Sequence, residues 1–304
     1  MQHGILPLWK ERGMTSHDCV FKLRKILQTK KVGHTGTLDP GVEGVLPICI
    51  GNATRLAEYL TDAGKMYEAV ISIGTSTTTE DAEGEIVEEN DSVKTITREQ
   101  LLTVLEGLTG EISQTPPMYS AVKINGRKLY EYARQGQVIE RPSRKVTIYA
   151  LELLGDKAVY EGATITFPVR IACSKGTYIR TLAVQIGEKL GYPAHMASLI
   201  RTASGNFTKE DCVTIDGLRE IAEAGELSKV IMPIEQALTD YPAFQITEDN
   251  HKQIINGQVL PMHSSLAEHD KIVFVENERA VAIYIKHPTK EGLMKPEKMF
   301  PAVD

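Results

Sequence analysis

One carboxylate, Asp39, stands directly before Pro40 in a glycine-rich segment, GHTGTLDPGVEGVLPICIG, at residues 33–51. The apolar run at residues 45–50 indicates that this segment returns at once into the core. A carboxylate on an ordered loop that a rigid scaffold aims can act as a nucleophile or a base. An isolated Asp before Pro more commonly forms a turn, with its carboxylate bonded to nearby backbone amides. Taken alone, the segment leaves both interpretations open.

The glycines of this segment could also belong to a phosphate-binding loop. A Walker-type loop ends in Gly-Lys-Ser or Gly-Lys-Thr, between a strand and a helix. No such lysine follows Gly33, Gly36 or Gly44. The sequence therefore argues against a Walker-type nucleotide site.

Arg180 is the second candidate, in the segment CSKGTYIRTL at residues 173–182. We expect a helix in residues 176–191, and the helix macrodipole disfavours a cation near its N-terminus. Pairing with a carboxylate such as Asp39 would explain the cation, and would keep the acid ionised and its rotamer fixed. Tyr178 would reach the same site only if the chain is extended or turned up to that residue. The alternative is a surface arginine and a core tyrosine.

Two further residues could face a nucleic acid. Tyr67 lies at the start of a predicted strand, where an aromatic side chain is usually part of the core. In a site that holds an unstacked base it could instead provide a stacking face. His34 adjoins the glycine-rich loop, and is either a hydrogen-bonded loop histidine or a group directed at nucleic acid.

The net charge of −6 hides two basic segments. Residues 22–31 carry five basic side chains and no acid, and residues 123–145 carry seven basic side chains against two acids. Residues 80–91, by contrast, are strongly acidic. Local basic stripes are the electrostatic footprint of phosphate-backbone binding. Each stripe alone fits a solvated helix face equally well, but two stripes flanking the candidate loop favour a polyanionic partner.

Composition indicates a globular protein with one large and one small domain, since 42% of the 304 residues are hydrophobic. The four cysteines form no CxxC pair and the eight histidines no HExxH pattern, so neither a disulfide framework nor a metal site is expected. No apolar stretch approaches the roughly 20 residues that a membrane-spanning helix needs. The N-terminal residues lack the features of a signal peptide, and we therefore expect a cytoplasmic protein.

Two capping boxes predict where helices begin. Thr15 and Asp18 precede one helix, and Thr97 and Gln100 precede another that ends near Gly110. A short helix is expected at residues 53–60, and a helix-prone region at residues 214–238.

Strands are expected at residues 65–74, 146–154 and 163–173, and the acidic residues 80–91 are expected to form a surface loop or hairpin. Pro168 suggests that the third of these strands is an edge strand or carries a bulge. Asn125-Gly126 is a hairpin signal. From about residue 240 the pattern changes to short strands and turns, which indicates a small β-rich module.

Together, several motifs resemble those of the bacterial TruB family, the tRNA pseudouridine-55 synthases: GMTSHD, GHTGTLDPGVEGVLPICIGNATR, KMYEA, PPMYSAVKINGRKLYEYARQG and CSKGTYIRTL. The resemblance runs from Gly4 to about Gly205, and INGQVLP resembles the family's small RNA-contacting module. It implies an α/β fold of the α+β type. We expect a catalytic domain with a mixed, largely antiparallel sheet in residues 1–238, and a C-terminal β-rich PUA-like module in residues 239–304.

The resemblance implies that Asp39 is the catalytic residue, which converts uridine to pseudouridine in the T-loop of tRNA. The base is detached, turned and rejoined through carbon, and no cofactor or metal is implied. Asp39 would act covalently or as the base that starts glycosidic cleavage. Tyr67 would stack on the target base and help to move its C5 proton, and Arg180 would pair with Asp39.

Four residues form the implied substrate-binding set. His34 would fill the space left by the extruded nucleotide, whose extrusion costs a few kcal/mol. Tyr178 would be the active-site tyrosine, and Leu199 would line the base pocket. Lys10 matches the lysine of the early K-P-x-G-x-[T/S]-S motif, with an expected structural role. Glu11 replaces the proline of that motif, so the loop is expected to be less rigid.

The sequence thus predicts a tRNA pseudouridine-55 synthase that flips its target base. We expect a monomer that binds the tRNA T-stem-loop and needs no membrane, metal or cofactor. One alternative is a catalytically silent tRNA-folding or RNA-binding protein, but binding phosphates gains nothing from the acid Asp39 and its partner Arg180. The other is pseudouridylation of another RNA, as in relatives guided by a separate RNA. The bacterial-style loops and the lack of a long basic tail argue against it.

Overall fold

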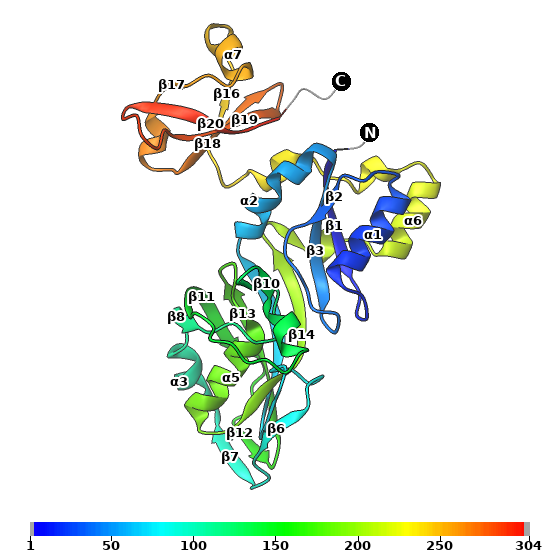
Figure 1. The fold of residues 1–304 in the computed structure, drawn as a ribbon, viewed down its shortest axis with the longest axis vertical. Coiled ribbons are helices and arrows are strands. Elements are labelled where there is room, and N and C mark those ends of the chain that lie inside the picture. Colours follow the sequence, from blue (N-terminus) through cyan, green and yellow to red (C-terminus); the bar gives the residue numbers. More distant parts are fainter. Residues whose placement is uncertain (1–2, 301–304) are drawn as a thin grey trace.

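The computed structural model describes residues 3–300 and contains two principal β-sheets. A nine-stranded sheet runs through the larger part of the chain, and a five-stranded sheet forms the C-terminal part (Figure 1). The strand order of the large sheet is β1-β3-β14-β4-β13-β11-β8, and β2 and β15 pair at β3 and β14. Only the pairing of β3 with β14 is parallel, so the predicted mixed, largely antiparallel sheet is confirmed.

The large sheet and three two-stranded sheets contain fifteen of the strands. The sheet consists of β1 (Gly4–Lys10), β2 (Val32–His34), β3 (Glu43–Ile50), β4 (Lys65–Ile73), β8 (Gly110–Gln114), β11 (Arg144–Leu153), β13 (Ile165–Cys173), β14 (Ala194–Ser204) and β15 (Phe207–Thr208). The small two-stranded sheets pair β5 (Thr75–Thr77) with β6 (Ile86–Glu89), β7 (Lys94–Thr97) with β12 (Val159–Gly162), and β9 (Lys123–Ile124) with β10 (Arg127–Lys128).

Seven α-helices and five short 3-10 helices complete the described part of the chain. The α-helices are α1 (Ser16–Ile26), α2 (Ala57–Asp62), α3 (Arg98–Glu106), α4 (Leu129–Ala133), α5 (Ile179–Leu190), α6 (Ile215–Glu223) and α7 (Glu248–Ile255). The 3-10 helices are η1 (Gly51–Leu56), η2 (Lys209–Asp211), η3 (Leu227–Lys229), η4 (Ile234–Ala237) and η5 (Ser264–Ala267).

Both predicted capping boxes begin helices. Thr15 and Thr97 are the N-cap residues of α1 and α3, and each exchanges hydrogen bonds with the residue three positions later. Helix α3 ends at Glu106, four residues before the predicted end near Gly110. The chain turns at residues 107–109 and continues from Gly110 into β8, so the apolar Leu108 is buried outside the helix.

Pro168 lies in an interior strand and no register shift occurs at it, so the expectation of an edge strand or a bulge was wrong. Strand β13 is flanked by β4 on one side and β11 on the other. The carbonyl of Pro168 accepts a hydrogen bond from Leu154, one residue beyond the end of β11. The N–H and C=O of a strand residue point to the same side. The N–H that proline lacks would therefore point to the same side as this carbonyl, beyond the last residue pair of β11 and β13. Its absence removes no hydrogen bond between these two strands.

The core of the larger part lies between one face of the sheet and the helices α3 and α5. Alternate residues of β4 and β13, among them Ile71 and Phe167, are fully buried, and α5 contributes Leu182 and Ile186. Helix α5 packs on β14 and β4, and α1 packs on β2 and α6. This arrangement fixes the N-terminus of α5 close to the loop that joins β2 and β3.

The C-terminal part is β-rich, as predicted. Its sheet has the order β16-β18-β19-β20-β17, formed by β16 (Ala243–Gln245), β17 (Leu260–Pro261), β18 (Lys271–Glu276), β19 (Arg279–Lys286) and β20 (Leu293–Met299). It has a hydrophobic cluster of its own, in which Phe274 and Tyr284 pack edge to face. A further cluster joins it to Leu56 and Tyr59 on η1 and α2.

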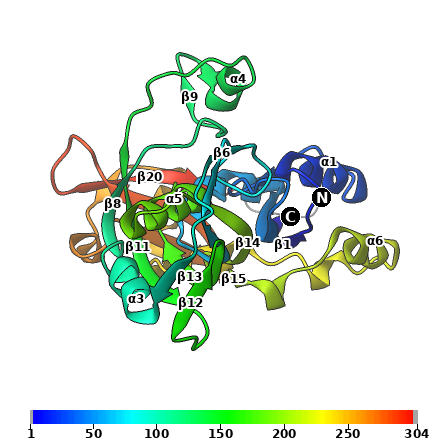
Figure 2. The ribbon, with the colours of Figure 1, turned by 90° about the horizontal axis from the view of Figure 1, so that it is seen from below.

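One excursion of the chain extends well away from the sheet. Residues 115–143, which carry β9, β10 and α4, stand off from the body when the molecule is viewed from below (Figure 2). The predicted hairpin at Asn125-Gly126 joins β9 and β10. We call residues 115–143 the projecting segment.

Candidate active site

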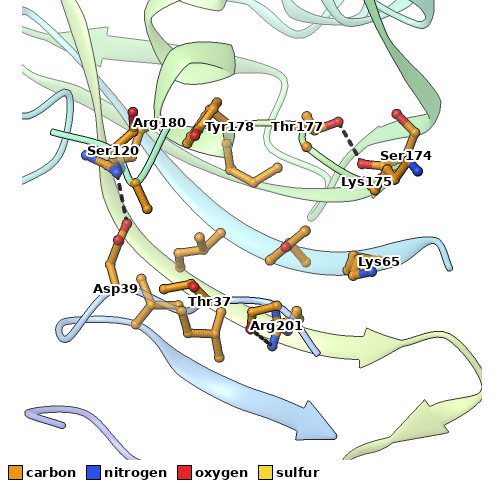
Figure 3. A pocket seen from close by; sticks show the side chains of 18 of the residues that line it. Thr37, Asp39, Lys65, Ser120, Ser174, Lys175, Thr177, Tyr178, Arg180 and Arg201 are labelled. Atoms are coloured by element: carbon orange, nitrogen blue, oxygen red, sulfur yellow. Dashed lines mark hydrogen bonds and ion pairs between the residues drawn. The ribbon is translucent and has the colours of Figure 1, made fainter. Parts of the chain in front are cut away.

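A cavity of about 410 Å³ lies between the β2–β3 loop, the inner face of the sheet, the N-terminus of α5 and the base of the projecting segment. Its size is in the range of small-molecule sites. Five of the seven predicted site residues line it: Asp39, Tyr67, Tyr178, Arg180 and Leu199. Asp39 and Arg180 lie at one end of the cavity, and Lys65 and Ser174 lie at the other (Figure 3).

Asp39 forms the ion pair that the sequence predicted. Its Oδ2 is 3.1 Å from Nη2 of Arg180. The Arg180 side chain is only 7% exposed, whereas that of Asp39 is 45% exposed. The guanidinium is therefore a fixed part of the protein, and the carboxylate remains open to a ligand in the cavity. A charge-assisted hydrogen bond of this kind favours the ionised acid and restricts its orientation.

Arg180 has three further partners that hold it in place. Its Nη1 donates to the carbonyl of Thr79 and its Nη2 to that of Tyr119, both at 2.9 Å. A second carboxylate, Asp81 Oδ2, lies 3.8 Å from Nη1. The sequence reasoning missed Asp81, because it belongs to the acidic segment interpreted as a surface loop. That segment does contain β6, which forms a hairpin with β5, but it also turns back onto β14 and α5.

Buried polar side chains hold the β2–β3 loop by hydrogen bonds to its backbone. The ammonium of Lys10, a fully buried residue, donates to the carbonyls of Val42 at 2.6 Å and Glu11 at 3.0 Å, and burial lowers its pKa. Ser16, at the start of α1, bonds both the N–H and the carbonyl of Leu38. Lys10 does not line the cavity, so the structure supports a role in shaping the loop.

Gly44 allows the chain that follows the β2–β3 loop to lie directly against the backbone of β14. It pairs with Arg201 in the parallel register of β3 and β14, at a φ of +133°. A Cβ atom there would lie 2.2 Å from the carbonyl oxygen of Arg201. Only glycine permits this close approach of two backbones.

Tyr67 and Leu199 form part of the floor of the cavity. They lie on the adjacent strands β4 and β14, and both are largely buried. Burial raises the pKa of the Tyr67 phenol, so it stays protonated near neutral pH. An aromatic face and an aliphatic side chain are suited to a flat base.

Tyr178 lies in an extended stretch of the chain, which is the condition under which the sequence predicted that it would reach the site. It is the N-cap of α5, with φ −97° and ψ 110°, so the helix begins only at the next residue. Its N–H donates to Oε1 of Gln114 at 2.9 Å. The guanidinium of Arg144 lies 4.9 Å from the centre of its ring. Tyr178 therefore reaches the cavity from an extended stretch.

His34 lies beside the cavity without lining it. Its Nδ1 accepts a hydrogen bond from the N–H of Gly36 at 3.3 Å. Burial, with contributions from Arg201 and His17, lowers the pKa of the imidazole, so it is neutral near pH 7.

Two buried cations in the cavity wall, Arg201 and Lys65, were not recognised from the sequence. Arg201 donates to the carbonyls of Val45 at 2.7 Å and Gly36 at 3.2 Å. Burial lowers the pKa of Lys65 to about 8, with a smaller contribution from Arg201. Each lies in a segment with a strong strand pattern, where only the burial of a charged side chain would have distinguished it.

The projecting segment carries basic side chains beside aromatic rings. The Arg127 guanidinium lies 4.5 Å from the centre of the Tyr132 ring, and Arg134 lies 5.3 Å from that of Tyr130. Among residues 3–300 there is no group of three or more His, Cys, Asp or Glu side chains placed to hold a metal ion. Within the same range, no helix has the length and apolar character needed to cross a membrane.

Comparison with protein families gives two matches. Residues 24–179 match the N-terminal domain of TruB family pseudouridylate synthases, and residues 180–239 match the C-terminal domain of tRNA pseudouridylate synthase B. Curated tRNA pseudouridine synthases B from Bacillus pumilus and Geobacillus thermodenitrificans are 56% and 54% identical to this chain. Each alignment covers 98% of this chain, and 98% and 99% of the relatives.

Solved structures show the same similarity. A Cbf5-Nop10-Gar1 complex contains a chain 29% identical to this one, with a TM-score of 0.70 over 97% of this chain and 84% of that chain. An H/ACA ribonucleoprotein bound to a substrate RNA containing 2′-deoxyuridine contains a chain 26% identical, with a TM-score of 0.70. That match covers 98% of this chain and 85% of the other.

Proposed function

The chain belongs to the TruB family of pseudouridylate synthases, and on that premise we propose that it converts uridine 55 in the T-loop of tRNA to pseudouridine, with Asp39 as the catalytic carboxylate. It is an isomerase that acts on uridine in tRNA. The observation that carries the residue assignment is the pair of Asp39 with the buried Arg180, at the end of a cavity that also holds Tyr67 and Leu199.

The reaction begins when the target uridine leaves its stack and enters the cavity. Its base lies against Tyr67 and Leu199, and its ribose faces Asp39. The N1–C1′ bond breaks, and its electron pair stays with the uracil ring. Asp39 either attacks C1′ or takes a proton from C2′, so in both routes the negative charge passes from the carboxylate to the detached uracil. Preorganised cations around such a site stabilise the developing charge.

The ring then turns and C5 bonds to C1′. The C5 proton is lost, N1 gains a proton, and Asp39 returns to its ionised form. Tyr67 lies beside the base, and its neutral phenol relays the proton: it gives its own proton to N1 and takes the C5 proton in return. Arg180 holds Asp39 throughout, and His34 is proposed to take the place of the extruded nucleotide.

The basic residues of α1 and of the projecting segment are suited to the phosphates of the tRNA, and the C-terminal part is proposed as a further RNA-contacting module. We place the boundary between the two domains at residues 238 and 239, where the chain passes between the two sheets. The protein is proposed to act as a cytoplasmic monomer.

A purely RNA-binding role accounts poorly for the site. Phosphate binding requires cations, whereas the cavity presents an accessible carboxylate. A buried guanidinium held by two carbonyls and two carboxylates is costly to assemble unless it positions one of those acids. The high identity to tRNA-specific relatives also favours tRNA over another RNA as the substrate.

Asp39→Asn tests the proposal directly. The amide can neither attack C1′ nor accept a proton, so this variant should bind an unmodified tRNA transcript nearly as the wild type does and form no pseudouridine. Pseudouridine is mapped at single-nucleotide resolution after incubation, which also identifies the position. Asp216→Asn, an exposed acid on α6 paired with Arg219, is the matched control and should retain full activity. Turnover by Asp39→Asn would refute the mechanism.

A further inference from the structure

Ser120 has a hydroxyl group that the protein itself leaves without a partner. The residue is only 5% exposed and lines the cavity. Its Oγ has no hydrogen-bond partner among residues 3–300. A buried hydroxyl left unsatisfied costs about 1–3 kcal/mol, and such groups are few in native proteins. The residue that carries this unused hydrogen-bonding capacity lines the cavity that the substrate enters.

The position of Ser120 relative to Asp39 is closely defined. Nη2 of Arg180 bonds both Asp39 and the carbonyl of Tyr119, the residue before Ser120. The carbonyl of Ser120 accepts a hydrogen bond from Tyr130 at 3.1 Å, which ties it to the base of α4. Figure 3 shows Ser120 beside Arg180, at the Asp39 end of the cavity.

The chemistry of the proposed reaction identifies what lies at that end. Asp39 acts at C1′ or on the proton of C2′, so the ribose must lie against it, while the base extends over Tyr67 and Leu199. The ribose hydroxyl nearest to these carbons is the 2′-hydroxyl, which is bonded to C2′. A serine hydroxyl both donates and accepts a hydrogen bond, as a ribose hydroxyl does.

We propose that the Ser120 hydroxyl binds the 2′-hydroxyl of the target uridine, as a substrate-contacting residue that orients the ribose toward Asp39. The inference rests on the proposed function. The contact is made only when the nucleotide is in the cavity, so its free energy contributes to binding and orientation of the substrate. It also gives the site a means to distinguish RNA from DNA, since the 2′-hydroxyl is the group in which they differ at the sugar.

The chain offers a matched pair of substitutions. Ser204 on β14 is likewise buried with an unpartnered hydroxyl, but it does not line the cavity. Ser120→Ala and Ser204→Ala each remove an unsatisfied group, so neither should lower the midpoint of thermal unfolding. Only Ser120→Ala should slow single-turnover pseudouridine formation, by at least about 3- to 10-fold, the equivalent of one hydrogen bond. Wild-type turnover by Ser120→Ala would overturn the proposal.

A second measurement identifies the atom that Ser120 contacts. The Asp39→Asn background prevents conversion, so the affinity for tRNA carrying either uridine or 2′-deoxyuridine at the target position can be compared. The 2′-deoxy substitution should weaken binding about 3- to 10-fold when Ser120 is present, and should have no further effect in Asp39→Asn/Ser120→Ala. Losses that multiply would show that Ser120 does not contact the 2′-hydroxyl. A wild type that forms no pseudouridine in tRNA would instead refute the proposed function.

Discussion

At the scale of single residues, the cavity is defined by charges whose surroundings differ sharply. Asp39 is half exposed and paired with a buried Arg180. Lys65 and Arg201 are buried and donate hydrogen bonds to backbone carbonyls, and neither is within 4.0 Å of a carboxylate in the described part of the chain. Burying a charge without an ionic partner is costly. The cost is understandable if the cavity must accept negative charge during the reaction.

Lys65 leads to a prediction about pH. Because burial lowers its pKa to about 8, its positive charge is present below that pH and is lost above it. Single-turnover rates of the wild type should therefore fall as the pH rises through about 8. Lys65→Arg keeps the charge at high pH, so its profile should decline only at higher pH. Identical profiles for the two proteins would show that the Lys65 charge does not contribute.

At the scale of elements, the β2–β3 loop depends on groups that are distant in the sequence. Lys10 at the end of β1 and Ser16 at the start of α1 together bond the carbonyls or N–H groups of Leu38 and Val42, which bracket Asp39. The resemblance placed Lys10 in the substrate-binding set, with an expected structural role. Its ammonium is buried beneath the loop, so we propose that it positions Asp39 without touching the RNA.

Lys10→Met distinguishes the two roles. The substitution leaves the carbonyls of Glu11 and Val42 without their donor. The free energy of unfolding should therefore fall by about 1–3 kcal/mol, measured by denaturant titration. Turnover should fall while the affinity for tRNA stays unchanged. Lys189→Met, at an exposed position on α5, is the control. A variant of normal stability but weakened tRNA binding would favour direct contact with substrate.

At the scale of the whole molecule, basic and acidic side chains lie on different segments. This separation explains how a protein with an acidic net charge can bind the proposed polyanionic substrate. The basic side chains of residues 22–31 and of the projecting segment are mostly exposed, while Glu80 and Asp81 of the acidic segment turn back toward α5 and Arg180. Because the positive charge is concentrated on these two segments, the protein can attract tRNA despite its net charge.

This leads to a prediction about salt. Binding to phosphates releases counterions, so the logarithm of the tRNA affinity should fall linearly with the logarithm of the salt concentration. Arg127→Gln in the projecting segment should reduce that slope by about one. Arg219→Gln on α6, where the guanidinium already pairs with Asp216, should leave it unchanged. A wild-type affinity that does not respond to salt would contradict the assignment of these segments to RNA binding.

Local patterns in the sequence were sufficient for most elements. The capping boxes at Thr15 and Thr97 began α1 and α3, because the hydrogen bonds that they make lie within one helical turn. The helix end near Gly110 and the edge position of Pro168 were wrong. Both features depend on which strand pairs with the segment in the folded protein. Helix or strand propensity and residue type do not reveal that pairing.

For the site, the motifs alone identified the family, the candidate acid Asp39 and its partner Arg180, a cation that the helix macrodipole disfavours at that position. Tertiary structure decided what surrounds that pair. Asp81 reaches Arg180 from the turn of a hairpin, Lys10 acts from beneath the loop, and Arg201 and Ser120 line a cavity formed by segments up to 165 residues apart. Such groups have ordinary residue types in ordinary patterns. Only burial and the presence or absence of a partner reveal their role, and both are properties of the folded chain.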